Sequence, residues 1–253
     1  MSAIEDPKPH FCQFERKRTI MEIIKSPEPT KICAPMVRYS KLQFRTLVRM
    51  YGCDIAYTPM IVSDSFLKSE ECRSVEFQTS KADTPLVVQF AASNAKDFAE
   101  ASELVYPYSD GVGLNAGCPQ RWAMAEGYGA KMLRCPEKIK DYVRFTRAKI
   151  NDEKFAVSVK IRLLEDVKKT VEMCQMLEQV GVSYIDVHGR TTQERHQPVH
   201  YDQIKTIKDN VSIPIIANGD VTTLDEVYEV CNKTGMYFSI LKYFSFYFAE
   251  LKS

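Results

Sequence analysis

Residues 155–190 read FAVSVKIRLLEDVKKTVEMCQMLEQVGVSYIDVHGR, and this stretch decides the fold. Short apolar runs at 155–161 and 184–188 have the length and the β-branched content of buried strands. The segment 167–180 between them repeats its apolar residues at helical spacing. A strand, a helix and a strand in such close succession form a βαβ unit, so we expect the two strands to be parallel members of one sheet.

The same alternation extends in both directions along the chain. No G-x-G-x-x-G turn follows the first predicted strand, which argues against an open dinucleotide-binding sheet. The 253 residues match the length of about 250 that is typical of one (β/α)₈ barrel, so we predict an α/β fold of the TIM-barrel type. The predicted strands are Ile32–Met36, Ile55–Met60, Leu86–Phe90, Gly111–Asn115, Phe155–Ile161, Tyr184–His188 and Ile213–Asn218, and the predicted helices are Phe11–Lys25, Lys96–Tyr106, Glu137–Ile150, Val167–Val180 and Leu224–Cys231.

The two ends of the chain depart from this pattern. We expect residues 1–30 to be a lead-in, residues 31–235 to form the barrel and residues 236–253 to be a divergent tail. The tail, MYFSILKYFSFYFAELKS, shows no βα alternation, so the barrel is expected to be incomplete, with seven βα units and two unpaired strand edges. It is too short and too charged, with Lys242 at its centre, to span a membrane.

Composition indicates one globular domain inside the cell. The eight cysteines include no C-x-x-C pair, which predicts reduced thiols, an intracellular and most simply cytoplasmic location, and no zinc site. Neither is a metal expected at His196 and His200, which lack a third ligand nearby. A formal charge of +1 gives no overall sign of nucleic-acid binding, so any RNA contact must come from local patches. We expect a monomer.

Polar and reactive residues collect where the predicted strands end. In a parallel barrel these ends lie on one face, the face that carries the active site in enzymes of this architecture. A single polar strand end is an ordinary structural feature, but a series of six in register indicates a site. The six are Ala34-Pro35-Met36, Gln89, Asn115-Ala116-Gly117-Cys118-Pro119, Lys160 with Arg162, His188-Gly189-Arg190, and Asn218-Gly219-Asp220.

Two neighbouring segments, NAGCPQ at 115–120 and GYGAKML at 127–133, together resemble the signature of the tRNA-dihydrouridine synthase family. The resemblance runs from about residue 31 to residue 235, and the branch it looks most like is the eukaryotic (20a/20b) synthase-like group. The other matching segments are APM at 34–36, VKIR at 159–162, DVHGRT at 186–191 and ANGD at 217–220.

The resemblance implies an FMN-dependent oxidoreductase in which NADPH or NADH reduces the flavin and a uridine in the D-loop of tRNA is reduced to dihydrouridine. The target base has to leave its stack to reach the flavin. The family's Gly-Arg-Gly-type loop and its helical tRNA-binding domain have no counterpart after Gly235. We therefore expect FMN and tRNA to be held more weakly than the motifs alone suggest.

The same resemblance assigns roles to the strand-end residues. Cys118 takes the position of the proton donor, and a thiol with the ordinary pKa of about 8.5 carries its proton at neutral pH. Lys160 would place a positive charge beside the pyrimidine edge of the reduced flavin. For each residue the alternative is an ordinary structural role. The predicted cofactor-binding residues are Ala34, Pro35, Met36, Gln89, Lys160, His188, Asn218, Gly219 and Asp220, and the predicted substrate-binding residues are Asn115, Arg162 and Arg190.

Two other functions remain open at this point. The aromatic tail after Gly235 favours an inactive form that acts at most as a binding partner. A different FMN barrel enzyme acting on a free pyrimidine is the second alternative, and the segment at 115–120 argues against it.

Overall fold

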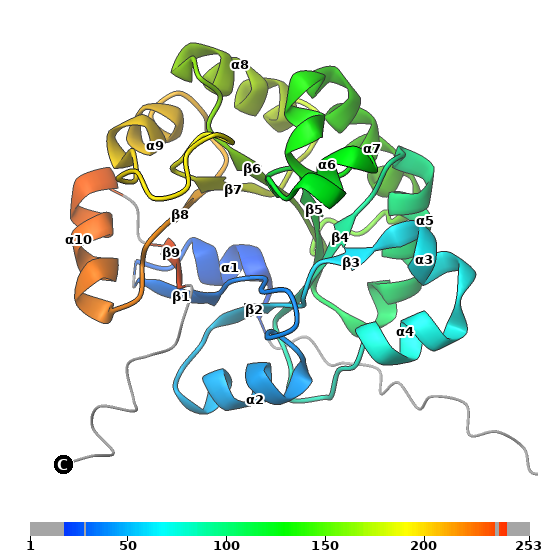
Figure 1. Cartoon of the computed structure of the whole chain (residues 1–253). Helices are drawn as coiled ribbons and strands as arrows, with labels where there is room; N and C mark the ends of the chain where they lie inside the picture. The colour runs from blue at the N-terminus through cyan, green and yellow to red at the C-terminus, as the bar shows by residue number, and fades with distance from the viewer. Residues whose placement is uncertain (1–17, 28, 236–237, 242–253) are drawn as a thin grey trace, which may run out of the picture.

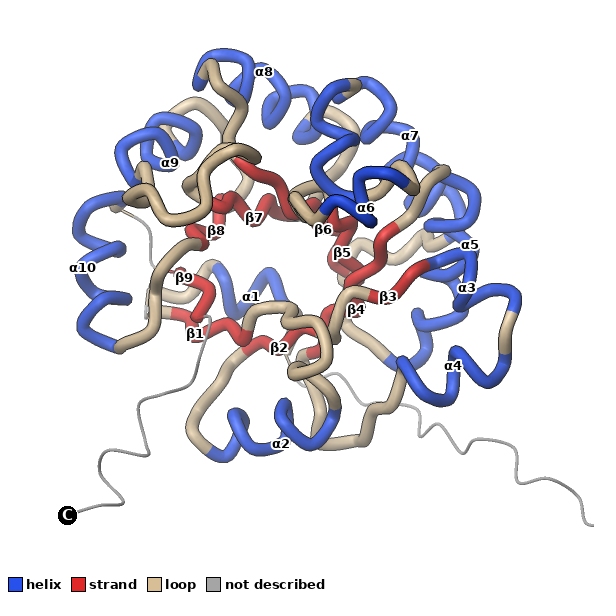
Figure 2. The backbone as a smooth tube through the Cα atoms, viewed as in Figure 1, coloured by secondary structure: helices blue, strands red, loops and turns tan. Residues whose placement is uncertain are grey.

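A ring of parallel strands surrounded by helices forms the molecule (Figures 1 and 2). The structure, a computed structural model, describes residues 18–27, 29–235 and 238–241. Of the nine strands in these ranges, all but β3 pair in a closed circle in the order β1, β2, β4, β5, β6, β7, β8, β9 and back to β1. The strands are β1 (Thr30–Cys33), β2 (Ile55–Tyr57), β3 (Ile61–Val62), β4 (Leu86–Ala91), β5 (Gly111–Asn115), β6 (Ala156–Arg162), β7 (Tyr184–His188), β8 (Ile215–Asn218) and β9 (Phe238–Leu241).

The helices lie outside the ring, except for α1, which is seen through its centre (Figure 1). The large apolar core fills the layer between strands and outer helices. The predicted TIM-barrel-type fold is therefore confirmed. The helices are α1 (Ile20–Ile24), α2 (Leu42–Met50), α3 (Ser63–Lys68), α4 (Glu70–Glu76), α5 (Ala95–Val105), α6 (Arg121–Ala125), α7 (Pro136–Lys149), α8 (Val167–Glu178), α9 (Tyr201–Lys208) and α10 (Leu224–Thr234), with 3₁₀ turns η1 (Tyr106–Tyr108) and η2 (Gly129–Arg134).

The expectation of two unpaired strand edges is wrong, because β9 pairs with both of its neighbours. Thr30 of β1 is opposite Phe238, and Ala217 of β8 is opposite Ser239. The sequence Phe-Ser-Ile-Leu suits an extended backbone, and its residues pair with all four residues of β1 and with the last two of β8. Its shortness, and the aromatic residues around it, concealed this strand in the sequence. The rest of the predicted tail lies outside the described residues.

Helix α1 belongs to the barrel although it precedes the predicted domain boundary at residue 31. Thr19 and Glu22 form a capping box at its start, which fixes where the helix begins. Its side chains Ile20 and Ile24 are fully buried and pack against residues near the start of the strands, including Tyr184. Helix α1 therefore closes the amino-terminal end of the ring, opposite the strand ends where the site was predicted. Residues 11–17 of the predicted helix lie outside the described part of the chain.

Candidate active site

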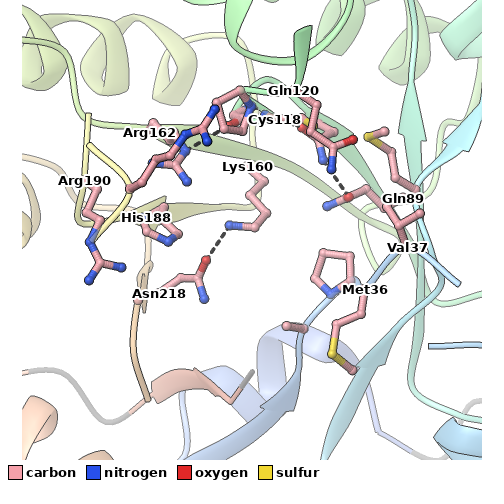
Figure 3. A pocket seen from close by; sticks show the side chains of 18 of the residues that line it. Met36, Val37, Gln89, Cys118, Gln120, Lys160, Arg162, His188, Arg190 and Asn218 are labelled. Atoms are coloured by element: carbon pink, nitrogen blue, oxygen red, sulfur yellow. Dashed lines mark hydrogen bonds between the residues drawn. The ribbon is translucent and has the colours of Figure 1, made fainter. Parts of the chain in front are cut away.

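A cavity of about 540 Å³ opens at the carboxyl ends of the strands (Figure 3). Every residue that the sequence assigned to a catalytic, cofactor or substrate role lines this cavity, so the structure brings the whole predicted set together. That set is Ala34, Pro35, Met36, Gln89, Asn115, Cys118, Lys160, Arg162, His188, Arg190, Asn218, Gly219 and Asp220, and the cavity is also lined by Val37, Tyr39, Met60, Gly117, Pro119, Gln120 and Arg195. The individual roles stay predictions.

The loop after β5 holds Cys118 through both halves of the signature motif. The side-chain oxygen of Asn115 accepts hydrogen bonds from the backbone N–H groups of Gly117, at 3.2 Å, and Cys118, at 2.9 Å. On the other side, the N–H of Ala130 donates to the Cys118 carbonyl at 2.9 Å. Gly129 has a φ of +61°, and a Cβ there would lie 2.6 Å from the same carbonyl. Only glycine fits this position, so the second half of the motif supports the first.

The amide of Gln89 faces the cavity in a defined orientation. Because two N–H groups occupy Oδ1 of Asn115, its Nδ2 is the donor to Oε1 of Gln89, at 2.8 Å. The Gln89 side chain is 1% exposed, and its Nε2 has no hydrogen-bond partner within the described part of the protein. Figure 3 shows this nitrogen on the side of the cavity. A buried amide donor without a partner is costly, so this group is suited to a ligand acceptor.

Lys160 reaches into the cavity from β6 and donates to Oδ1 of Asn218, the last residue of β8, at 2.6 Å (Figure 3). Burial lowers the pKa of Lys160 to about 8, and Asp186 on β7 partly opposes this. Burial raises the pKa of Asp186 to about 7, while Lys160 and a hydrogen bond from Tyr57 act in the other direction. The cavity is thus lined by a lysine whose pKa is lowered to about 8, and a buried carboxyl group on the neighbouring strand is coupled to that lysine.

The two predicted substrate-binding arginines are bound by protein groups. Arg162 donates from Nε to the Gly117 carbonyl at 3.1 Å and from Nη1 to the Thr191 carbonyl at 2.8 Å, and burial lowers its pKa. Arg190 forms a two-pronged ion pair with Asp220 and is 6% exposed. Arg190 therefore joins the loops after β7 and β8.

Sequence reasoning missed some residues of the site. Tyr39, 68% exposed at the cavity rim, lies in the loop after β1 and has no motif that would have marked it. Asp186 lies two residues before His188 in β7, and strand alternation places both on one face. That signal was present in the sequence and was not used.

Within the described ranges, no group of three or more His, Cys, Asp or Glu side chains is placed to hold a metal ion. None of the described helices has the length and apolar character needed to cross a membrane.

Comparison with known proteins gives a consistent result. A family model described as dihydrouridine synthase (Dus) matches residues 32–237. The chain is 55% identical over 225 residues to "tRNA-dihydrouridine(20a/20b) synthase [NAD(P)+]-like" from Homo sapiens, covering 89% of this chain and 71% of the human protein. Identity to "tRNA-dihydrouridine(20a/20b) synthase [NAD(P)+]" from Schizosaccharomyces pombe is 45% over 216 residues, covering 85% of this chain and 66% of that protein.

Among solved structures, oxaloacetate acetylhydrolase in complex with oxalate superposes with a TM-score of 0.59 at 11% identity, covering 92% of this chain and 81% of that one. At such low identity the similarity concerns the fold alone.

Proposed function

Because this chain belongs to the dihydrouridine synthase family, we propose that it is a tRNA-dihydrouridine synthase that reduces the C5=C6 bond of a D-loop uridine. FMN would be its bound cofactor, and NADPH or NADH its reductant. The observation that carries the proposal is the meeting of Cys118, Gln89 and Lys160 around one cavity. A thiol, a free amide donor and an ammonium group are suited to protonating a base and holding an electron-rich ring.

The residues present fit an FMN group. The cavity volume lies within the range of about 300–1,000 Å³ typical of small-molecule sites. The unpartnered Nε2 of Gln89 would donate to a ring heteroatom, and the Lys160 ammonium would stabilise negative charge on the reduced ring. The small side chain of Ala34, 6% exposed, leaves the backbone of the loop after β1 open to close approach. When bound, FMN supplies the hydride.

The chain's own residues position the base and move the proton. Hydride addition at C6 of the uridine leaves negative charge at C5, and the Sγ–H bond of Cys118 would break as a new C5–H bond forms. Asn115 and Gly129 hold the loop so that Cys118 lines the cavity. A uridine that enters this cavity must be unstacked from its neighbours, and Arg195 and the exposed Tyr39 at the rim are candidates to contact the flanking nucleotides.

The test is to supply FMN to the purified chain, remove the excess, record the visible spectrum, and then assay dihydrouridine in tRNA with NADPH. A retained flavin band and dihydrouridine formation are expected. Reduction of a free pyrimidine without reduction of tRNA would instead show the alternative barrel enzyme. A folded protein that takes up no flavin would leave only a binding role.

Replacement of Gln89 by leucine is expected to weaken FMN binding about tenfold, because one hydrogen bond worth about 1–1.5 kcal/mol is lost. Quenching of flavin fluorescence during titration measures the Kd. The matched control is Gln175→Leu, which removes a surface amide that donates to the Asn210 carbonyl on the outside of the barrel. Equal affinities for the two variants would exclude Gln89 from the flavin site.

A further inference from the structure

A buried carboxyl group lies in the barrel interior and has no place in the mechanism above. Asp186 is 0% exposed, and its register partner on the neighbouring strand is Lys160. Its Oδ2 accepts a hydrogen bond from the hydroxyl of Tyr57 at 2.9 Å, while Oδ1 has no hydrogen-bond partner in the described ranges. The hydroxyl of Tyr184 lies 2.7 Å from that of Tyr57. Since Tyr57 donates to the carboxylate, Tyr184 must donate to Tyr57.

The hydrogen bonds from Tyr184 to Tyr57 and from Tyr57 to Asp186 run in one direction. Two hydroxyl groups in series point their protons toward Asp186, which favours its charged form. Lys160 of β6, which is opposite Asp186 in the strand register, lines the cavity. Its ammonium donates to Asn218 rather than directly to Asp186. Asp186 therefore acts on Lys160 through the field in the barrel interior, where a low dielectric makes such interactions strong.

Four other groups act on Lys160 and Asp186, and the direction in which each shifts a pKa decides whether Lys160 keeps its proton. Burial raises the pKa of Asp186 to about 7, and both Lys160 and the Tyr57 hydroxyl oppose this rise. Burial lowers the pKa of Lys160 to about 8, Arg162 lowers it further, and Asp186 and Cys118 oppose the fall. Tyr184 completes the set through Tyr57. Without the Asp186 charge, burial and Arg162 would act together to remove the proton from Lys160.

We propose that Asp186 is a positioning residue for the charge on Lys160: its carboxylate, supported by Tyr57 and Tyr184, keeps the lysine protonated at neutral pH. The identity of the ligand ring whose charge Lys160 would stabilise rests on the proposed function. The interaction between Asp186 and Lys160 is a property of the chain alone. Asp186 is not among the residues that line the cavity. Its contribution is that the site keeps its positive charge over a wider range of pH.

The direct test measures the ionisation of Lys160 in the protein without flavin. Competitive labelling with acetic anhydride at a series of pH values, read out by mass spectrometry of the Lys160 peptide, gives the pH at which its amine loses its proton. Asp186→Asn keeps the shape and an oxygen acceptor for Tyr57 but removes the charge. This midpoint is expected to fall by about one unit. An unchanged midpoint in folded Asp186→Asn protein would overturn the proposal.

Two further variants separate the coupling from a loss of packing. Tyr142→Phe removes another buried hydroxyl, which belongs to helix α7 and donates to the Ala92 carbonyl at 3.2 Å, and should leave the labelling midpoint unchanged. If Asp186→Asn fails to fold, Tyr57→Phe replaces it, because losing that hydrogen bond makes the carboxyl harder to ionise. The midpoint of Lys160 must then fall as well, by less than in the asparagine variant, and no fall would overturn the proposal.

The second readout is the pH dependence of FMN binding. Affinity that depends on protonated Lys160 is present at low pH and is lost as pH rises through about 8, and Asp186→Asn should move this loss to lower pH by about one unit. In a Lys160→Met background the same substitution should have no further effect on the pH profile. If the natural chain takes up no FMN, the proposed function fails while the labelling experiment still decides the coupling.

Discussion

Replacing Cys118 with alanine is expected to reduce dihydrouridine formation by at least about 100-fold, while FMN binding and its reduction by NADPH stay unchanged. A positioned general acid contributes about 10²–10⁴-fold to a rate, and alanine removes the only proton that this residue can donate. The loop should survive, because Asn115 and Ala130 bind the backbone of residue 118 and not its side chain.

The measurement separates the two half-reactions. Flavin reduction is followed by absorbance with NADPH and no tRNA, and reoxidation by tRNA is then followed without oxygen, with dihydrouridine counted in the product. Cys135→Ala is the matched control, since Cys135 is an exposed thiol that does not line the cavity. Undiminished tRNA reduction by the Cys118→Ala variant would remove this residue from its role.

The largest expected effect on stability comes from Asp83→Ala, which should lower the free energy of unfolding by about 3–5 kcal/mol. Asp83 and Arg45 are each 1% exposed, and the carboxylate accepts from Nη2 of Arg45 at 2.7 Å and from Nε of Arg49 at 3.1 Å. Alanine would leave two guanidinium groups without their counter-charge, one of them fully buried. Removing one partner of a buried pair is far more damaging than replacing both.

Urea unfolding followed by circular dichroism measures this loss. The matched control is Asp209→Ala, which breaks an exposed pair with Lys205 on α9 and should change stability by less than about 1 kcal/mol. The buried pair also bears on the site, because Nη1 of Arg45 donates to the Ser40 carbonyl at 2.6 Å at the end of the loop that carries Met36. A loss as small as that of the control would show that the arginines find other partners.

The strands were the most predictable part of the fold because an apolar run of a few consecutive residues marks each of them. All seven predicted strands are present, and the main errors at their ends have a common cause. Proline lacks the N–H that a strand ladder needs, so β1 ends before Pro35, β2 ends before Pro59 and β8 begins after Pro214. The predicted helices at 96–106, 137–150, 167–180 and 224–231 are likewise present, as α5, α7, α8 and α10.

What could not be predicted depends on contacts between distant parts of the chain. Strand β9 exists because two open edges accept four residues from the far end of the sequence. Within the site, motif spacing located the residues that line the cavity, but the bond from Tyr57 to Asp186 joins residues 129 positions apart. No local pattern encodes such a contact. The pairing of Arg190 with Asp220 was missed for the same reason, although both residues were expected near the cavity.

Helix α1, which closes the amino-terminal end of the ring, has a kinetic consequence for the proposed reaction. Because Ile20 and Ile24 are buried at the amino-terminal end of the ring, reductant and RNA would use the same entrance at the strand ends in the proposed reaction. In the proposed reaction the nicotinamide would then leave before the uridine enters, which is a double-displacement order. Double-reciprocal plots of initial rate at several fixed NADPH concentrations should therefore be parallel, whereas intersecting lines would mean that both substrates share the cavity at once.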